Sequence, residues 1–193
     1  NPASHFWYLT EDEIPATAQF KNPVTGEMII ELRSTGGQTV VPPSRYNNPD
    51  SNEKGYFQLD WEKFDLPATV SATTLRQAVA RVAALTLLAE HWNRQGSRHV
   101  AALALSGMLL RGGFCVEDAE TFLETLCDAA DDDEVEDRVA TVAHTAGKIK
   151  AGEPATGAPT LTELFDPKLV AALQKWLELR RGACDAIADG ANA

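Results

Sequence analysis

The chain has 193 residues, enough to bury a core, which favours one domain or two small ones. Its 28 Asp and Glu residues against 17 Lys and Arg residues give a net charge of −11, and no segment is basic, which argues against a protein that grips long stretches of duplex by its phosphates. No apolar run approaches the ~20 residues of a membrane span, and three cysteines without recognised metal spacing favour a cytoplasmic chain with buried thiols over a disulfide framework.

Composition divides the chain into two parts. Residues 1–70 hold most of the prolines and the short β-branched runs, whereas residues 71–151 are rich in alanine and leucine and contain no proline. Strand and loop material followed by helical material predicts an α+β fold, with a partial mixed or antiparallel β-sheet followed by an α-helical bundle. The boundary is expected near residues 65–71, where Leu66-Pro67 interrupts the pattern and Ser71 or Thr73 can cap a helix.

Residues 27–46 predict a β-hairpin. Two short β-branched runs, Met28 to Leu32 and Gln38 to Val41, are joined by Gly36-Gly37. Glycine reaches the positive φ of a tight turn at no steric cost. The pattern therefore predicts that the first run pairs with Val40-Val41 through this turn.

Polar side chains gather at this predicted hairpin. Glu31 and Arg33 share one face, since side chains on a strand alternate between faces. Pro42-Pro43 ends the pairing, because proline has no N–H to donate. This places Ser44 and Arg45 near the end of the strand that bears the carboxylate.

Apolar residues recur at helical spacing through the second part of the chain. Gly96 is expected to end a first helix in the left-handed conformation, and Ser106-Gly107 permits a second helix to approach a neighbour closely. The predicted helices cover residues 73–95, Ser97 to the Gly112-Gly113 stop, 116–130, 131–150 and 168–181.

The fourth predicted helix opens with an acidic run, residues 131–134, and closes with Lys148 and Lys150. Acidic residues at the N-terminal end and basic residues at the C-terminal end suit the helix dipole. The acidic run therefore has a structural explanation, with metal binding as the alternative.

Two stretches resemble active-site motifs of the primase-polymerase branch of the archaeo-eukaryotic primase superfamily. The string IELRSTGGQTVVPPSRY, residues 30–46, resembles its third motif and following hairpin, and Ala3-Ser4-His5-Phe6-Trp7-Tyr8 resembles its second motif. His5 and Glu31 lie 26 residues apart in the expected order. Residues 75–165 resemble the small helical domain that follows the catalytic domain in plasmid and phage primase-polymerases.

The resemblance implies roles for particular residues. Glu31 would be a catalytic ligand of Mg²⁺ or Mn²⁺, and His5 would contact the phosphates of the incoming nucleotide. Further nucleotide contacts would come from Arg33, Ser44 and Arg45. Basic side chains near two helix ends would bind single-stranded template, with Trp92 as a stacking platform or a core residue. These template-binding candidates are Arg94, Arg98, His99 and Arg111.

The implied activity is template-directed, metal-dependent nucleotidyl transfer in plasmid or phage replication. Its partners would be a single-stranded DNA template, nucleoside triphosphates and a replicative helicase domain, in the cytoplasm. The family's first motif, a carboxylate pair, should precede His5 and is not in this sequence. The expectation is therefore the C-terminal part of the catalytic domain over residues 1–70, a helical bundle over 71–165 and a terminal helix and tail over 166–193, which alone is catalytically incomplete.

Other interpretations stay open. Glu31 can be a strand residue paired with Arg33, His5 a core histidine, and Ser44 and Arg45 ordinary turn residues. On that interpretation the chain is a non-catalytic replication accessory module, whose helical domain binds single-stranded nucleic acid or protein. An upstream carboxylate pair in the full-length gene would separate the two classes.

Overall fold

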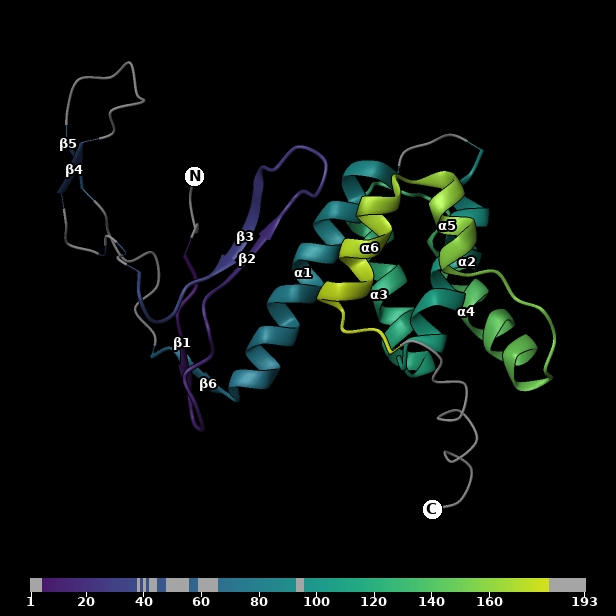
Figure 1. The fold of residues 1–193 in the computed structure, drawn as a ribbon, viewed down its shortest axis with the longest axis horizontal. Helices are drawn as coiled ribbons and strands as arrows, with labels where there is room; N and C mark the ends of the chain where they lie inside the picture. The colour runs from purple at the N-terminus through teal and green to yellow at the C-terminus, as the bar shows by residue number, and fades with distance from the viewer. Residues whose placement is uncertain are drawn as a thin grey trace. The chain divides into compact units, whose positions relative to one another are not determined.

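A computed structural model of the chain describes residues 5–37, 39, 41, 45–47, 56–58, 66–92 and 96–180, with the backbone alone for 45–47 and 56–58. The described residues form an α+β structure, as predicted (Figure 1). Its strands are β1 (Tyr8–Thr10), β2 (Ala18–Lys21), β3 (Met28–Leu32), β4 (Arg45–Asn47), β5 (Tyr56–Gln58) and β6 (Ala68–Val70). Its helices are α1 (Ala72–Trp92), α2 (Arg98–Arg111), α3 (Val116–Ala129), α4 (Val135–Lys150), α5 (Ala158–Leu164) and α6 (Pro167–Trp176).

The chain divides into two compact units. The strand unit comprises residues 1–18 and 32–76, and the helical unit comprises residues 19–31 and 77–193. The described strands form two-stranded sheets that pair β1 with β6, β2 with β3 and β4 with β5. The β1–β6 pair is parallel and the β4–β5 pair antiparallel.

The strand unit fixes the start of α1. The Ser71 hydroxyl accepts a hydrogen bond from the Thr74 N–H at 3.0 Å, so Ser71 is the cap that the sequence predicted with Thr73 as the alternative. The Asp12 carboxylate accepts a second bond from the Ala72 N–H at 2.9 Å. This backbone hydrogen bond holds the pKa of Asp12 below its ordinary value.

Among the described strands, β3 pairs with β2, a partner that the sequence did not predict. A strand carrying Glu31 is confirmed. Thr39 and Val41 lie outside any strand, while Gln38 and Val40 lie outside the described residues.

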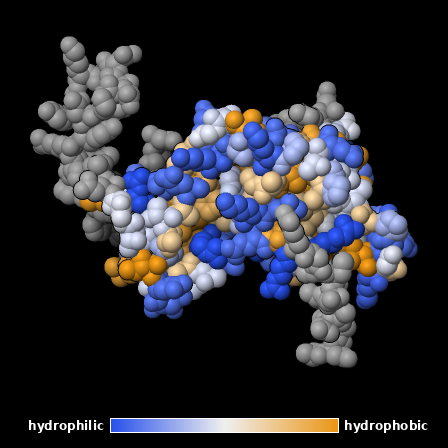
Figure 2. All heavy atoms as spheres, in the orientation of Figure 1, coloured by the Kyte–Doolittle hydropathy of each residue, from blue (hydrophilic) through white to orange (hydrophobic). Residues whose placement is uncertain are grey.

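The four helices predicted between residues 73 and 150 are confirmed as α1 to α4. Helix α2 packs against α3, α4 and α5, and its buried residues cover every side of the helix, as expected for a central helix. Leu105, Leu109 and Leu123 are fully buried in the shared core. Hydrophilic side chains cover much of the face shown in Figure 2. Within the described part of the chain, no helix is both long enough and apolar enough to cross a membrane.

Two helices are shorter than predicted, while the left-handed conformation predicted at Gly96 is confirmed. Gly96 has the predicted positive φ, +86°. Helix α4 begins at Val135 rather than Asp131, which itself has a φ of +50°. Helix α6 ends at Trp176, shortly before Glu178 with a φ of +52°. Left-handed residues cannot continue a right-handed helix, which explains both shorter helices.

Helix α5 was not predicted from the sequence, and the segment before it explains the glycine at position 107. The close approach predicted at Ser106-Gly107 is to the segment that precedes α5, since a Cβ on Gly107 would lie 1.9 Å from the Thr156 carbonyl oxygen. Arg111 donates from its Nη1 and Nη2 atoms to the carbonyl oxygens of Thr156 and Ala155 at 2.9 and 2.7 Å. Arg111 therefore holds this segment against α2 beside Gly107.

Of the two described cysteines, one is buried and one is exposed, whereas the sequence predicted buried thiols. Cys127 is buried, and this burial raises its pKa to about 11. Cys115 is exposed, and its Sγ atom accepts a hydrogen bond from the Asp118 N–H at the start of α3. Cys184 lies outside the described residues.

Candidate functional site

The hairpin of β2 and β3 is built on a polar turn. The Asn22 side-chain oxygen accepts hydrogen bonds from the Val24 and Thr25 N–H groups at 2.9 and 3.2 Å. The Gly26 N–H donates to the Asn22 carbonyl oxygen at 2.8 Å, and Gly26 takes a φ of +79°. An asparagine that bonds the backbone two residues ahead, followed by glycine, is a strong local turn former.

This hairpin belongs to the helical unit and is anchored on the helices. Phe20 is 7% exposed and meets the Trp176 ring edge-to-face, with centroids 5.4 Å apart. Ile29 packs against the helical core. The Asn22 Nδ2 atom donates to the Glu90 carboxylate of α1 at 3.3 Å. These contacts fix both strands relative to α1 and α6.

Glu31 is half-buried on β3 and oriented by a neighbouring strand. The Gln19 Nε2 atom of β2 donates to Glu31 Oε1 at 3.0 Å. A hydrogen bond of this kind fixes the direction of a carboxylate and is the usual outer partner of a metal-binding carboxylate. Glu31 is therefore held in one orientation on an anchored hairpin.

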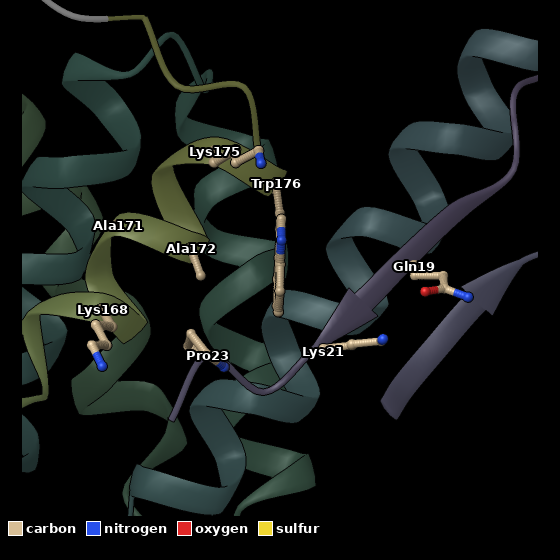
Figure 3. Close-up of a pocket in the computed structure, with 8 residues that line it drawn as sticks. All are labelled: Gln19, Lys21, Pro23, Lys168, Ala171, Ala172, Lys175 and Trp176. Carbon is tan, nitrogen blue, oxygen red and sulfur yellow. The ribbon is translucent and has the colours of Figure 1, made fainter. Parts of the chain in front are cut away.

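Gln19 also lines a cleft between β2 and α6. The cleft has a volume of about 480 Å³, and Figure 3 shows the residues that surround it. Lys21 comes from β2, and Lys168 and Lys175 come from α6, with Trp176 between the two elements. The residues that line the cleft are Gln19, Lys21, Pro23, Lys168, Ala171, Ala172, Lys175 and Trp176.

The other predicted nucleotide contacts lie in different surroundings. His5 is exposed and precedes β1, so the alternative of a core histidine does not describe it. Arg33 is exposed in the strand unit, and its Nη1 atom donates to the Thr39 hydroxyl at 3.4 Å. Ser44 lies outside the described residues, and of Arg45 only the backbone in β4 is described. Their roles stay predictions.

The predicted template-binding residues divide into two groups. Arg98 and Arg111 are engaged in internal contacts, the first with Asp132 at 3.3 Å and the second with the segment before α5. His99 is exposed on the first turn of α2. Arg94 lies outside the described residues. A template contact by any of them stays a prediction.

Asp132 is the centre of a buried polar network rather than a residue of the helix start. It is 3% exposed, and its Oδ2 atom accepts from Trp92 Nε1 at 2.9 Å and from Arg138 Nε at 3.2 Å. Arg138 also pairs with Glu134. The network joins α1, α2 and α4 through charge-assisted hydrogen bonds.

The pKa of Asp132 reflects this network. Burial acts to raise it, but the hydrogen bonds from the Trp92 side chain and the Glu134 N–H, together with the Arg138 charge, hold the pKa below its ordinary value. The carboxylate is therefore ionised in the folded protein at neutral pH. Asp132 of the acidic run therefore has a structural role, as predicted. It acts through ion pairs with Arg98 and Arg138 rather than through the dipole of helix α4.

The implied Mg²⁺ or Mn²⁺ ion can be compared with the groups present. Among the described residues, no three carboxylate, histidine or cysteine side chains gather into a metal cluster. Glu31 itself is a hard oxygen ligand held by Gln19. Magnesium sites often use only one or two protein carboxylates, with water and substrate phosphates completing the shell. Glu31 fits the role of one such ligand.

Comparisons with known proteins give no relative: no family model matches the chain, and no match is found among curated proteins or among solved structures.

Strand β2, and therefore the cleft, was not predicted from the sequence. The signal was present: Gln19 and Lys21 are exposed while Phe20 is buried, a strict alternation, and the Asn22 to Gly26 turn follows directly. On α6, Lys168 and Lys175 lie two helical turns apart, so they share a face with Ala171 and Ala172. That Lys21 of β2 lines the same cleft depends on tertiary packing.

Proposed function

We propose that this chain is part of a primase-polymerase that carries out template-directed, metal-dependent nucleotidyl transfer. The observation that carries the proposal is Glu31, a half-buried carboxylate on a strand, oriented by Gln19 within the sequence motif that resembles the family's third motif. The resemblance assigns this position to a metal ligand. The partners on this proposal are single-stranded DNA, nucleoside triphosphates and a replicative helicase domain.

The chemistry needs a carboxylate of this kind. A bound Mg²⁺ or Mn²⁺ ion would polarise the transferred phosphoryl group and neutralise charge on the attacking and leaving oxygens. Glu31 would hold the ion, and Gln19 would keep the Glu31 carboxylate in one orientation. His5, whose exposed imidazole can donate a hydrogen bond, would contact nucleotide phosphates.

The test is primer extension by the longest natural polypeptide that contains this chain. Glu31→Gln keeps the size of the side chain but removes the charge that a divalent ion requires. We expect extension with Mg²⁺ or Mn²⁺ to fall by at least about 100-fold, equivalent to about 3 kcal/mol at the metal-bridged transition state, while template binding is kept. His5→Ala should raise the apparent KM for the nucleotide.

A matched control is Glu27→Gln, which makes the same charge change at an exposed position of the same hairpin. This variant should extend primers like the wild type. Full activity of Glu31→Gln would remove the metal-ligand role. If the wild type extends no primer with either metal, the chain is better described as a replication accessory module.

A further inference from the structure

The cleft between β2 and α6 concentrates positive charge in an acidic protein. Its eight lining residues, all described, include Lys21, Lys168 and Lys175 and no carboxylate. The whole chain carries a net charge of −11. All three lysines are exposed, so their ammonium groups are available to a ligand. An anion would therefore be attracted to this face of the helical unit.

The lysines are spread along the cleft. Lys168 and Lys175 stand at the two ends of α6 (Figure 3), and seven residues at a helical rise of about 1.5 Å separate their backbones by about 10 Å. Phosphates of a B-form strand recur every ~3.4 Å along the duplex axis and lie further apart along an extended single strand, so a separation of about 10 Å spans more than one phosphate in either case. Such spacing suits a chain of phosphates better than a single phosphate group.

Trp176 supplies a flat apolar surface among these charges. It is half-buried, lines the cleft, and is held by the edge-to-face contact with Phe20 at 5.4 Å. Ala171 and Ala172 also line the cleft, and their short side chains leave space on α6 beside Trp176. Unpaired bases stack on aromatic side chains, whereas the bases of a duplex are covered by their neighbours.

We infer that the β2–α6 cleft binds single-stranded nucleic acid, with Lys21, Lys168 and Lys175 contacting phosphates and Trp176 stacking against a base. These residues differ from the predicted template contacts Arg94, Arg98, His99 and Arg111. The inference rests on the proposed function only in taking the strand to be a template. Binding is measured without metal or nucleotide, so the inference and the proposed catalysis can fail separately.

The experiment measures binding of a fluorescently labelled oligothymidylate by anisotropy over a range of salt concentrations. Each phosphate contact with a single strand contributes about 0.7 to the salt slope, equivalent to about fivefold in affinity near ~0.1 M salt. Each of Lys21→Gln, Lys168→Gln and Lys175→Gln should therefore weaken binding about fivefold. The triple variant should lose about 100-fold and lower the slope by about 2.

Lys150→Gln is the matched control, because it makes the same charge change at an exposed lysine outside the cleft. It should bind like the wild type, and circular dichroism should show unchanged helix content in every variant. Absence of binding by the wild type at low salt would overturn the inference. Equal binding by the triple variant and Lys150→Gln would also overturn it.

The chemistry of the ligand is tested with three competitors. An abasic strand of equal length should bind about 5- to 150-fold more weakly if one base stacks on Trp176. A duplex of the same length and polyglutamate should also compete poorly. Equal competition by the abasic strand would show that the cleft recognises a polyanion alone. Strong competition by polyglutamate would assign the cleft to an acidic protein partner, and either result would overturn the inference.

Discussion

Asp132→Asn is expected to lower the free energy of unfolding of the helical unit by about 3–5 kcal/mol. The substitution keeps the shape of the side chain but removes its charge. Arg138, 5% exposed, would then remain buried without its full counter-charge, and Arg98 would lose its acidic partner. Removal of one member of a buried ion pair is costly because the remaining charge stays desolvated. Urea unfolding followed by circular dichroism measures the change.

The control is Asp133→Asn, the same substitution one residue later at an exposed position, which should change stability by less than about 0.5 kcal/mol. A pH series adds a second readout. The folded pKa of Asp132 is lowered, so its stabilising contribution is present above the ordinary pKa and is lost as pH falls through the folded pKa. Asp132→Asn should therefore lose less stability than the wild type over that acidic range. Equal unfolding midpoints for Asp132→Asn and Asp133→Asn would contradict the expected role.

Gly107→Ala is expected to destabilise the helical unit by about 1–3 kcal/mol or more, although alanine is the better helix former. The added Cβ would lie 1.9 Å from the Thr156 carbonyl oxygen, a backbone atom that cannot rotate away. Relief of this overlap requires the segment before α5 to move. That movement would break the Arg111 hydrogen bonds to Ala155 and Thr156. Thermal or urea unfolding measures the loss.

Gly147→Ala provides the matched comparison in α4. This glycine is exposed, and a Cβ there would meet no atom within 4 Å. The same substitution should therefore stabilise the protein by about 0.5–1 kcal/mol through helix propensity. The free energy of unfolding is therefore expected to fall on substitution of Gly107 and to rise on substitution of Gly147. Stabilisation at Gly107 would show that the α5 segment does not approach α2 as closely as described.

The sequence predicted α1 to α4 well because their apolar residues recur at helical spacing and their ends carry local signals. Ser71 caps α1 through a neighbouring N–H, and Gly96 takes the left-handed conformation, both without tertiary contacts. Helix α5 was missed because its seven residues are too few to show a helical period. Its position depends on α2, where Gly107 leaves room for the chain.

The partner of β3 could not be chosen by pattern alone. Both Gly36-Gly37 and the Asn22 to Gly26 segment read as turns, and both Gly36 and Gly26 take positive φ. The pairing of β3 with β2 is held by bonds from Asn22 and by the burial of Phe20 and Ile29 on the helices. The partners of the charged residues could not be predicted from the sequence either. Sequence shows where Arg98 and Arg111 lie, but only the fold shows that Asp132 and two carbonyl groups already engage them.

The division of the chain has a practical consequence for dissecting the protein. The polypeptide passes between the strand unit and the helical unit at residues 18/19, 31/32 and 76/77, so the two units are not consecutive along the sequence. An expression fragment that starts at residue 71 would lack Phe20 and Ile29 and leave the Trp176 side of the bundle uncovered. Such a fragment would expose apolar surface and favour aggregation. A fragment for studying the helices should therefore begin before β2.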